Sequence, residues 1–504
     1  MNRINLKEKI KEIIIDKKEL IALIMYAVIT FIITIIFHEK WRDEAQAWFL
    51  AKDLNIIELI KQMSYEGHPP LWHLILMPFA KLGFPYITES IISWVIMCIA
   101  TWLMLKKSPF KFETKILIIA SLPYIYLYPT IARSYCLIPL AIALIAIYYP
   151  VRSEKKIEYT LSILLLAYTH ILMLGLVGIL YLFFFLEQIF YTKNNKKKDL
   201  IISLLIAIVG LISLIFMLYG STEKNTELAL FNVWNLNKYK FKMLIKTIQN
   251  ELFGIVSISS GFRSWINIAA LVLIIWESRK NLQNLIIATI SIMWQVFIYL
   301  CIFGSSAQKI NTIFVILIFI AWINMEEEKN KRKEYKDNNI CSRIVILICM
   351  FCLILSDIEG ITQIKSKIKR KYSYAEEAAQ YIENNLEDDS IFVADTGYLV
   401  SAIIPYTENK RFWNSSSKQY FTYMTWNKIS NQEMYVDQII ENIKQEFDDK
   451  SHLYLIMSNK NADSKNNEKI IKLQQEGILS DTLYSSKESS IICEEVYNIY
   501  KINL

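Results

Sequence analysis

The sequence lacks the motifs by which cytosolic enzymes hold nucleotide-linked donors. It contains no Gly-x-Gly-x-x-Gly fingerprint, no Walker phosphate loop and no Asp-x-Asp pair for the metal of a nucleotide sugar. A nucleotide-sugar donor bound on the cytosolic side is therefore not expected. The longest loop expected in the cytoplasm, about 326–339, is also too short to form a catalytic domain.

The sequence also lacks two features of secreted proteins: a pair of cysteines in its polar C-terminal part and a cleavable signal peptide at its start. Of the seven cysteines, only Cys493 lies in the polar C-terminal part, so no disulfide can form within that part. The first apolar run, about 19–37, is long and lacks a small-residue cleavage site. We therefore expect this run to remain as a membrane anchor.

Long apolar runs dominate the rest of the sequence. Hydrophobic residues make up 54% of the 504 residues, and the mean hydropathy of +0.29 is too high for an ordinary soluble protein. Because a spanning helix needs roughly 20 apolar residues, the sequence predicts a mainly α, polytopic membrane protein with about eleven transmembrane helices. The candidate spans are about 19–37, 86–105, 114–130, 134–150, 158–169, 171–191, 200–219, 264–276, 283–303, 310–325 and 340–357.

The loops between these runs predict an orientation. Every second loop is rich in Lys and Arg, so these loops are expected in the cytoplasm, together with the N-terminus. The loop 38–85, the loop 220–263 and the tail after about residue 358 are then extracellular. The net charge of +7 reflects these basic loops, and a nucleic-acid partner is not expected.

The tail, 358–504, is less hydrophobic and alternates predicted helices with predicted strands, which is typical of a small α/β domain. We therefore expect two domains: a transmembrane module, 1–357, whose external loop 38–85 carries the polar motif, and an external domain, 358–504. The elements expected in the external domain are helices at 374–386 and 437–447 and strands at 390–394, 453–457 and 496–502.

An adjacent acid pair, Asp43 and Glu44, follows the first apolar run directly. Trp41, Trp48 and Phe49 are spaced on one face of a helix, together with Ala45. Such a helix is expected to lie in the membrane interface, with the two acids in its first turn. Adjacent helical residues point about 100° apart. One acid can then face a cavity while the other pairs with Lys40, Arg42 or a neighbouring helix.

A second helix is expected after Gly67-His68-Pro69-Pro70. Pro69 favours extended conformations at His68, and Pro70 suits the first turn of a helix. The first N–H groups of this helix would point back towards His68 and could hold an anion such as phosphate. Taken alone, an Asp-Glu pair at a helix start is usually a cap and a lone histidine is usually a turn residue. Their combination behind a membrane helix is much less common.

These motifs resemble the GT-C superfamily of integral-membrane glycosyltransferases, in particular the branch with protein O-mannosyltransferases and lipid A aminoarabinose transferases. The matching residues are Asp43-Glu44 and His68-Pro69-Pro70-Leu71. The motif-based resemblance covers about 15–200, and beyond that it rests on topology. It implies a polyprenyl-phosphate-linked sugar as donor, transfer to an acceptor hydroxyl on the outer face with inversion, and Asp43 as the general base, supported by Glu44.

A leaving lipid phosphate needs cationic or N–H partners. The candidates on the outer side are His68, Arg133 beside Tyr135, and Lys309. For Arg133 and Lys309 the alternative is a side chain that extends to the membrane surface. His170 could hydrogen-bond the sugar or the phosphate, or could be a satisfied polar residue between helices. The resemblance also implies that an acid near the position of Glu66 can hold a metal, but the spacing leaves a metal open, and no cofactor is predicted.

Two other classes of function remain open from the sequence. One is a transporter or flippase of lipid-linked glycans, although such proteins place ionisable groups near mid-membrane, where these spans have few. The other is a non-catalytic membrane protein whose external domain binds cell-wall polymer. Neither class needs an acid at position 43. The acceptor, whether glycan, lipid or protein, is not readable from the sequence.

Overall fold

The computed structural model divides the chain into two compact units, and each is described by itself. The helical unit comprises Met1–Ile36, Ser90–Tyr219 and Leu230–Ile364, and the sheet unit includes Phe37–Glu89 and Lys365–Leu504. The structure describes residues 2–190, 197–218, 238–252, 268–269, 271–273, 275–276, 278–302, 304–331, 340–427, 429–430, 432, 434–447, 452–458, 464–486, 490–492 and 494–503.

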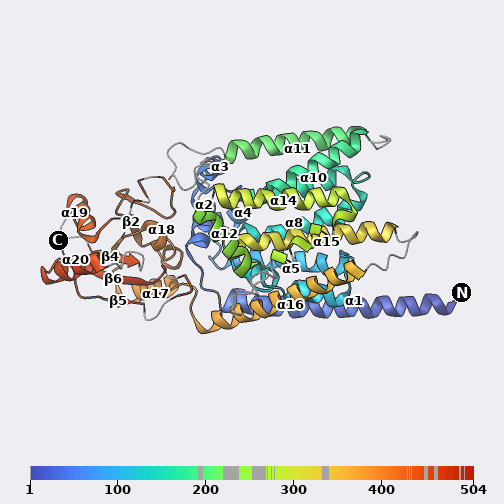
Figure 1. Ribbon diagram of the computed structural model, residues 1–504. Helices are drawn as coiled ribbons and strands as arrows, with labels where there is room; N and C mark the ends of the chain where they lie inside the picture. The colour runs from blue at the N-terminus through green and yellow to red at the C-terminus, as the bar shows by residue number, and fades with distance from the viewer. Residues whose placement is uncertain are drawn as a thin grey trace. The chain divides into compact units, whose positions relative to one another are not determined.

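The helical unit consists of long apolar helices and short irregular turns (Figure 1). Eight helical segments among the described residues are long and apolar enough to span a membrane: Ile15–Ile36, Thr88–Lys107, Ser134–Val151, Ile171–Phe190, Lys197–Leu218, Leu282–Cys301, Ala307–Glu327 and Ile346–Lys369. The elements that run through the unit are α1 (Asn2–Phe31), η1 (Ile32–Ile36), α5 (Thr88–Lys107), α6 (Phe112–Ala120), η2 (Pro123–Leu127), α7 (Tyr128–Thr130), η3 (Ser134–Cys136), α8 (Leu137–Tyr148), η4 (Tyr149–Val151), α9 (Lys156–Ala167), η5 (Ile171–Met173), α10 (Leu174–Phe190), α11 (Lys197–Leu218), α12 (Lys238–Glu251), η7 (Ser278–Lys280), α14 (Leu282–Cys301), α15 (Ala307–Lys331) and α16 (Ile340–Lys369).

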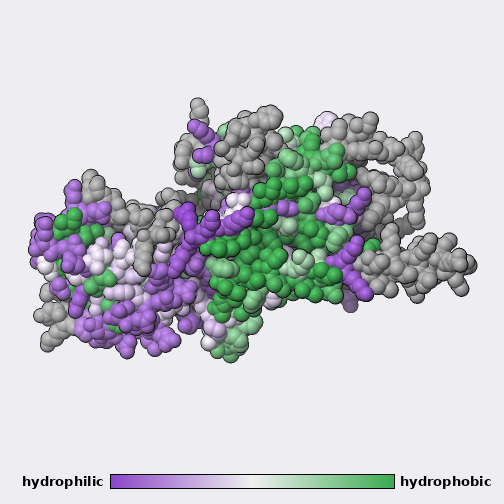
Figure 2. Space-filling model, turned by 90° about the horizontal axis from the view of Figure 1, so that it is seen from below, coloured by the Kyte–Doolittle hydropathy of each residue, from purple (hydrophilic) through white to green (hydrophobic). Residues whose placement is uncertain are grey.

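The surface of this unit is apolar over a wide area (Figure 2). Large hydrophobic side chains on α1 and α16 are more than half exposed, among them Ile21, Met25, Leu347 and Ile361. A soluble protein rarely exposes a contiguous apolar patch of more than a few hundred Å². This surface is therefore suited to contact lipid chains.

Eight of the eleven predicted spans coincide with these eight segments. The run 114–130 is helical but broken into α6, η2 and α7, and the N–H of Leu122 at the break donates to Ser356 Oγ at 3.0 Å. The run 158–169 corresponds to α9, which has 12 residues. The run 264–276 is described only at 268–269, 271–273 and 275–276, and most of the loop 220–263 lies outside the described residues. The last span continues to Lys369, beyond the predicted end at 357.

The sheet unit contains the small α/β domain that the tail predicts. Its six strands have the order β3-β2-β1-β4-β6-β5, with β1 parallel to both β2 and β4 and the remaining pairs antiparallel. All five predicted elements are present within two residues of their expected ends. The elements are α17 (Ala375–Asn385), β1 (Ile391–Ala394), α18 (Gly397–Val400), η8 (Ile404–Tyr406), β2 (Arg411–Asn414), β3 (Gln419–Tyr420), α19 (Val436–Glu446), β4 (Leu453–Ser458), α20 (Ser464–Gln475), β5 (Tyr484–Ser485) and β6 (Tyr497–Ile502).

Both faces of the central strands are buried, because successive side chains of a strand point to opposite faces. Phe392 and Ala394 of β1 belong to one apolar cluster, which includes residues of α17. Ile391 and Val393 belong to a second cluster, which includes residues of α19 and α20. The sequence shows this as a short continuous apolar run in β1.

The motif loop packs within the sheet unit as three helices: α2 (Arg42–Asp53), α3 (Ile56–Glu66) and α4 (Leu71–Lys81). The expectation that the aromatic face of α2 contacts the membrane interface is not met. Trp48 and Phe49 are buried, and Phe49 lies in the same apolar cluster as Tyr374 and Ile403 of the tail. The amphipathic pattern identified an apolar face, and protein covers that face instead of lipid.

Close contact between α10 and α14 generates a stability prediction. A Cβ at Gly175 would overlap the side chain of Trp294, with Trp294 Cγ only 2.6 Å away. Because overpacking a tight contact costs about 1–3 kcal/mol, Gly175→Ala should lower the unfolding temperature in detergent. Gly178→Ala on the same helix is the control, since no described atom lies within 4 Å of its Cβ position. Equal midpoints for the two variants would contradict this packing.

Candidate functional site

The acid pair lies at the start of α2, as predicted. The helix begins at Arg42 after the extended residue Trp41, which places Asp43 and Glu44 in the first turn. The carboxylate of Glu44 accepts a hydrogen bond from the N–H of Trp41 at 3.2 Å and so closes that turn. The two acids have different surroundings: Glu44 is fully buried, whereas the side chain of Asp43 is 24% exposed.

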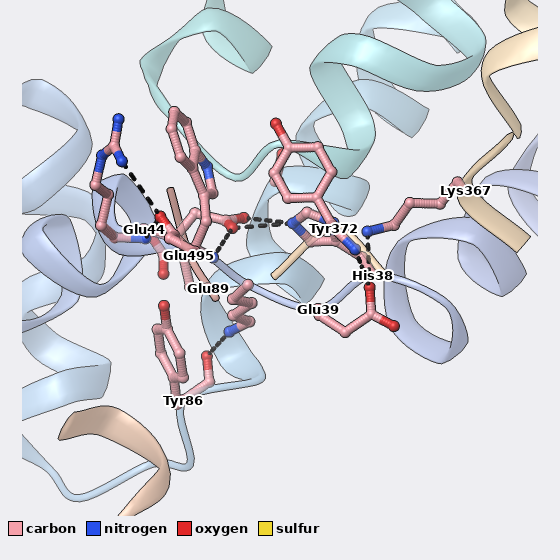
Figure 3. Close-up of polar contacts among 12 residues, drawn as sticks. His38, Glu39, Glu44, Tyr86, Glu89, Lys367, Tyr372 and Glu495 are labelled. Carbon is pink, nitrogen blue, oxygen red and sulfur yellow. Dashed lines mark hydrogen bonds and ion pairs between the residues drawn. The ribbon is translucent and has the colours of Figure 1, made fainter. Parts of the chain in front are cut away.

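Glu44 is paired with a buried histidine (Figure 3). His38 Nε2 lies 2.9 and 3.1 Å from the two carboxylate oxygens of Glu44. Burial lowers the pKa of His38 below its usual value, although the nearby Glu44 opposes this effect. The imidazole is therefore neutral at pH 7, and its Nε2–H donates to Glu44. Glu44 is thus paired with His38, and the pairing with Arg42 that the sequence allowed is made by Asp43.

A second ion pair lies beside His38. Lys367 Nζ is 3.0 Å from Glu39 Oε2, which also accepts the N–H of Tyr372 at 2.9 Å. The ring of Tyr372 contacts the His38 ring edge-on, with centroids 5.2 Å apart (Figure 3). The last turn of α16 and the residues after it are thereby joined to the segment that precedes α2.

Lys40 is also buried, although it lies only three residues before Asp43. Its Nζ donates to the carbonyl of Tyr86 and lies 3.5 Å from the centroid of the Tyr86 ring. Burial lowers the pKa of Lys40 to about 8, and the charges of Glu89 and Glu44 limit the shift. Its backbone N–H donates to the hydroxyl of Tyr406 at 3.1 Å.

Arg42 brings Asp43 next to the tail. Arg42 Nε lies 3.9 Å from Asp43 Oδ1, and its Nη1 lies 2.8 Å from Glu494 Oε2. The backbone N–H of Arg42 donates to Glu495 Oε1 at 3.2 Å. Glu495 is fully buried, and burial raises its pKa to about 7, against the lowering effects of Ser373 and Arg42.

Glu66 and His68 lie together at the turn between α3 and α4. Glu66 Oε1 accepts hydrogen bonds from Gln46 at 2.8 Å and from Gln62 at 3.2 Å. His68 Nε2 is 4.0 Å from Glu66 Oε2, and the His68 ring stacks on His73 with centroids 5.4 Å apart. No group of three or more His, Cys, Asp or Glu suited to a metal occurs in the described parts of the chain.

The segment Gly67–Pro70 leads into a second helix, α4, nearly as predicted. Gly67, with φ of 75°, ends α3, and Pro70 immediately precedes the first residue of α4 instead of lying within its first turn. The first N–H groups of α4 therefore belong to Leu71 and Trp72. Trp72 Nε1 donates to Glu89 at 3.3 Å, which holds this helix start against the end of the loop. Pro78 lies inside α4, which ends three residues later at Lys81.

The other four candidates belong to the helical unit. Tyr135 Oη and His170 Nε2 are 3.2 Å apart, and their rings stack at 5.1 Å. Because His170 Nδ1 accepts the N–H of Leu172, a neutral ring carries its proton on Nε2 and donates to Tyr135. Arg133 is half-buried in an extended conformation before η3. Lys309 Nζ donates to the carbonyl of Gly304 at 3.2 Å.

Sequence reasoning gave no role to His38, Glu494 or Glu495. His38 was visible as one of five histidines, but no spacing rule connects it with Glu44. Glu494 and Glu495 lie 452 and 453 residues beyond Arg42. The only signal in the sequence is that they form an adjacent acid pair just before the last strand.

Comparison with known proteins supports the fold. No family model matches the chain, and no curated protein matches it. Among solved structures, the chain is similar to ArnT from Cupriavidus metallidurans bound to undecaprenyl phosphate. The TM-score is 0.51 at 8% identity, and the match covers 96% of this chain and 97% of that chain. At this identity the similarity shows the fold alone: a membrane fold similar to that of ArnT, with a small C-terminal sheet domain. The chain is therefore a membrane protein.

The His38–Glu44 pair generates a second stability prediction. Glu44→Ala would leave the buried Nε2–H of His38 and the partly buried N–H of Trp41 without their acceptor, which costs about 1–3 kcal/mol for a fully buried donor and less for a partly exposed one. Glu44→Gln keeps an acceptor of the same size and should lose less. The matched control is Glu58→Ala, because Glu58 has the same place in α3 and accepts the N–H of Asn55, but is exposed. Thermal unfolding in detergent measures all three, and an equal loss for Glu44→Ala and Glu58→Ala would refute the importance of the buried pair.

Proposed function

We propose that this protein is a glycosyltransferase that moves a sugar from a polyprenyl-phosphate-linked donor to an acceptor hydroxyl on the outer face of the membrane, with inversion. The observation that carries the proposal is that the two adjacent acids in the first turn of α2 have different surroundings. Glu44 is buried and paired with His38, whereas Asp43 is partly exposed one residue earlier. The undecaprenyl phosphate in the ArnT structure supports a polyprenyl phosphate as the lipid part of the donor.

In the proposed reaction Asp43 is the general base. Its carboxylate accepts the proton of the acceptor hydroxyl while the hydroxyl oxygen bonds to the anomeric carbon of the sugar. The bond between that carbon and the phosphate oxygen breaks, and its electron pair leaves with the lipid phosphate. Attack opposite the leaving group inverts the anomeric carbon. Glu44 does not touch the reacting atoms in this scheme and fixes the direction of Asp43 through the first turn of α2.

The remaining candidates stay predictions about the donor. We propose that His68, Arg133 and Lys309 supply charge for the phosphate, with the N-terminal end of α4 beside His68. The carboxylate of Glu66 lies 4.0 Å from His68 Nε2. Tyr135 and His170, already joined by a hydrogen bond, are proposed to bind the sugar or the phosphate as a pair.

The central prediction concerns the acid pair. Asp43→Asn keeps the shape of the side chain but loses its basicity, so turnover should fall by about 10²–10⁴-fold. Glu44→Gln should lose less, because it keeps its hydrogen bonds with His38 and Trp41. The measurement is release of lipid phosphate by purified protein supplied with short-chain polyprenyl-phosphate sugars at saturation. Near-normal turnover of Asp43→Asn with an inactive Glu44→Gln would reverse the roles. Normal turnover of both would exclude the proposed function of this loop.

The proposed orientation places the N-terminus in the cytoplasm and the sheet domain outside the cell. A cysteine at Gln419, which is exposed, should react with an impermeant thiol reagent on intact cells. The neighbouring Ser415 is unsuitable, because it is fully buried. A cysteine at the exposed Lys198, in a predicted cytoplasmic loop, is the matched control and should react only after lysis. Reversed labelling, measured against the parent protein, would invert the topology.

A further inference from the structure

The guanidinium of Arg42 lies among three carboxylates of the sheet unit. Its Nη1 is 2.8 Å from Glu494 Oε2 and 3.8 Å from Glu495 Oε1, while its Nε is 3.9 Å from Asp43 Oδ1. Of these three contacts, the one with Glu494 is within hydrogen-bond distance. The guanidinium of Arg42 is therefore closer to the carboxylate of Glu494 than to that of the adjacent Asp43.

Aromatic rings and the backbone also restrain Arg42. Its guanidinium carbon lies 5.3 Å from the ring centroid of Tyr398 and 5.5 Å from that of Trp41, distances suited to cation–π attraction. The backbone N–H of Arg42 donates to Glu495. Tyr398 belongs to α18, directly after β1, whereas Glu494 and Glu495 precede β6. Two separate segments of the C-terminal α/β domain thus contact Arg42, the first residue of α2.

This arrangement matters because Arg42 and Asp43 are neighbours in the chain. An arginine released from its partners would have a carboxylate within easy reach, and a close Arg–carboxylate pair is strong and often bidentate. A carboxylate engaged in this way is a poorer proton acceptor, because the adjacent positive charge stabilises its ionised form. Partners that hold Arg42 elsewhere would keep Asp43 basic.

We propose that Glu494 and Glu495 are positioning residues for the reaction: they hold the Arg42 guanidinium away from a close ion pair with Asp43, so that the sheet domain sets the competence of the base. The inference rests on the proposed function of Asp43. It gives the C-terminal domain a direct part in turnover, beyond any binding of acceptor.

The test is a rescue experiment on the full-length protein in detergent, with lipid-phosphate release as the readout. Glu494→Gln/Glu495→Gln should lower kcat by about tenfold or more, while KM for the lipid-linked donor changes by less than about threefold. Removing the released arginine as well, by adding Arg42→Gln, should restore kcat to the level of the single Arg42→Gln variant. If these contacts only docked the sheet domain onto α2, the triple variant should be no faster than the double variant, because removing Arg42 would break a further docking contact.

A single substitution at a more exposed residue separates an effect on turnover from a loss of folding. Glu494 is 41% exposed, so Glu494→Gln should unfold at the wild-type temperature. This variant should still lose turnover and should still be rescued by Arg42→Gln. The matched control is Asp437→Asn, which breaks the Lys469–Asp437 pair of 2.7 Å in the same unit, away from Arg42, and should leave kcat unchanged.

The outcomes separate the inference from the proposed function. If Asp43→Asn is inactive but the variants at 494 and 495 turn over normally, the positioning role is wrong and the function stands. The positioning role is also wrong if the triple variant is no faster than the double variant. If Asp43→Asn is itself active, the proposed function fails whatever the other variants do.

Discussion

The burial of Glu44 is the constraint on which the motif region depends. A carboxylate removed from water is costly unless hydrogen bonds compensate it, and Glu44 obtains them from His38 and from the N–H of Trp41. These contacts fix where α2 begins and how its first turn is rotated. Since the next side chain in a helix points about 100° away, the direction of Asp43 follows from the burial of Glu44. The buried Glu44 thereby orients Asp43, the acid proposed as the general base.

The same helix is fastened at several other points by segments far away in sequence. The amide of Gln46 exchanges hydrogen bonds with the backbone of Met424, donating to its carbonyl at 2.7 Å and accepting its N–H at 2.8 Å. Tyr406 accepts the N–H of Lys40, and Glu495 accepts that of Arg42. Each contact satisfies a buried or half-buried polar group, so losing one leaves an uncompensated donor or acceptor. The helix start and the sheet domain therefore act as one compact unit.

The sequence predicted local features well and distant pairings poorly. Strands such as β1 and β4 were readable because short apolar runs alternate with helical patterns, and the acid pair was placed at a helix start by spacing alone. The aromatic face of α2 was also readable, but not the chain segment that covers Phe49. The partners of Glu44 and Arg42 could not be predicted either. Contacts such as Arg42–Glu494 join residues hundreds of positions apart, so they leave no periodicity in the sequence.

The sheet contacts the start of α2 near the carboxyl ends of β1 and β4, where β6 begins. In open α/β sheets, ligands bind at the carboxyl ends of the strands where the strand order reverses, which here is the position of β1 between β2 and β4. At this edge Asp395 accepts two hydrogen bonds from Ser458, at 3.0 and 3.1 Å, and α18 follows. Tyr398 of α18 faces Arg42, and the carbonyl of Leu399 accepts the hydroxyl of Tyr497 at 2.9 Å. The edge that a nucleotide would occupy in a related architecture thus contacts the start of α2. At this edge the sheet domain contacts the first residue of α2 through Tyr398, Glu494 and Glu495.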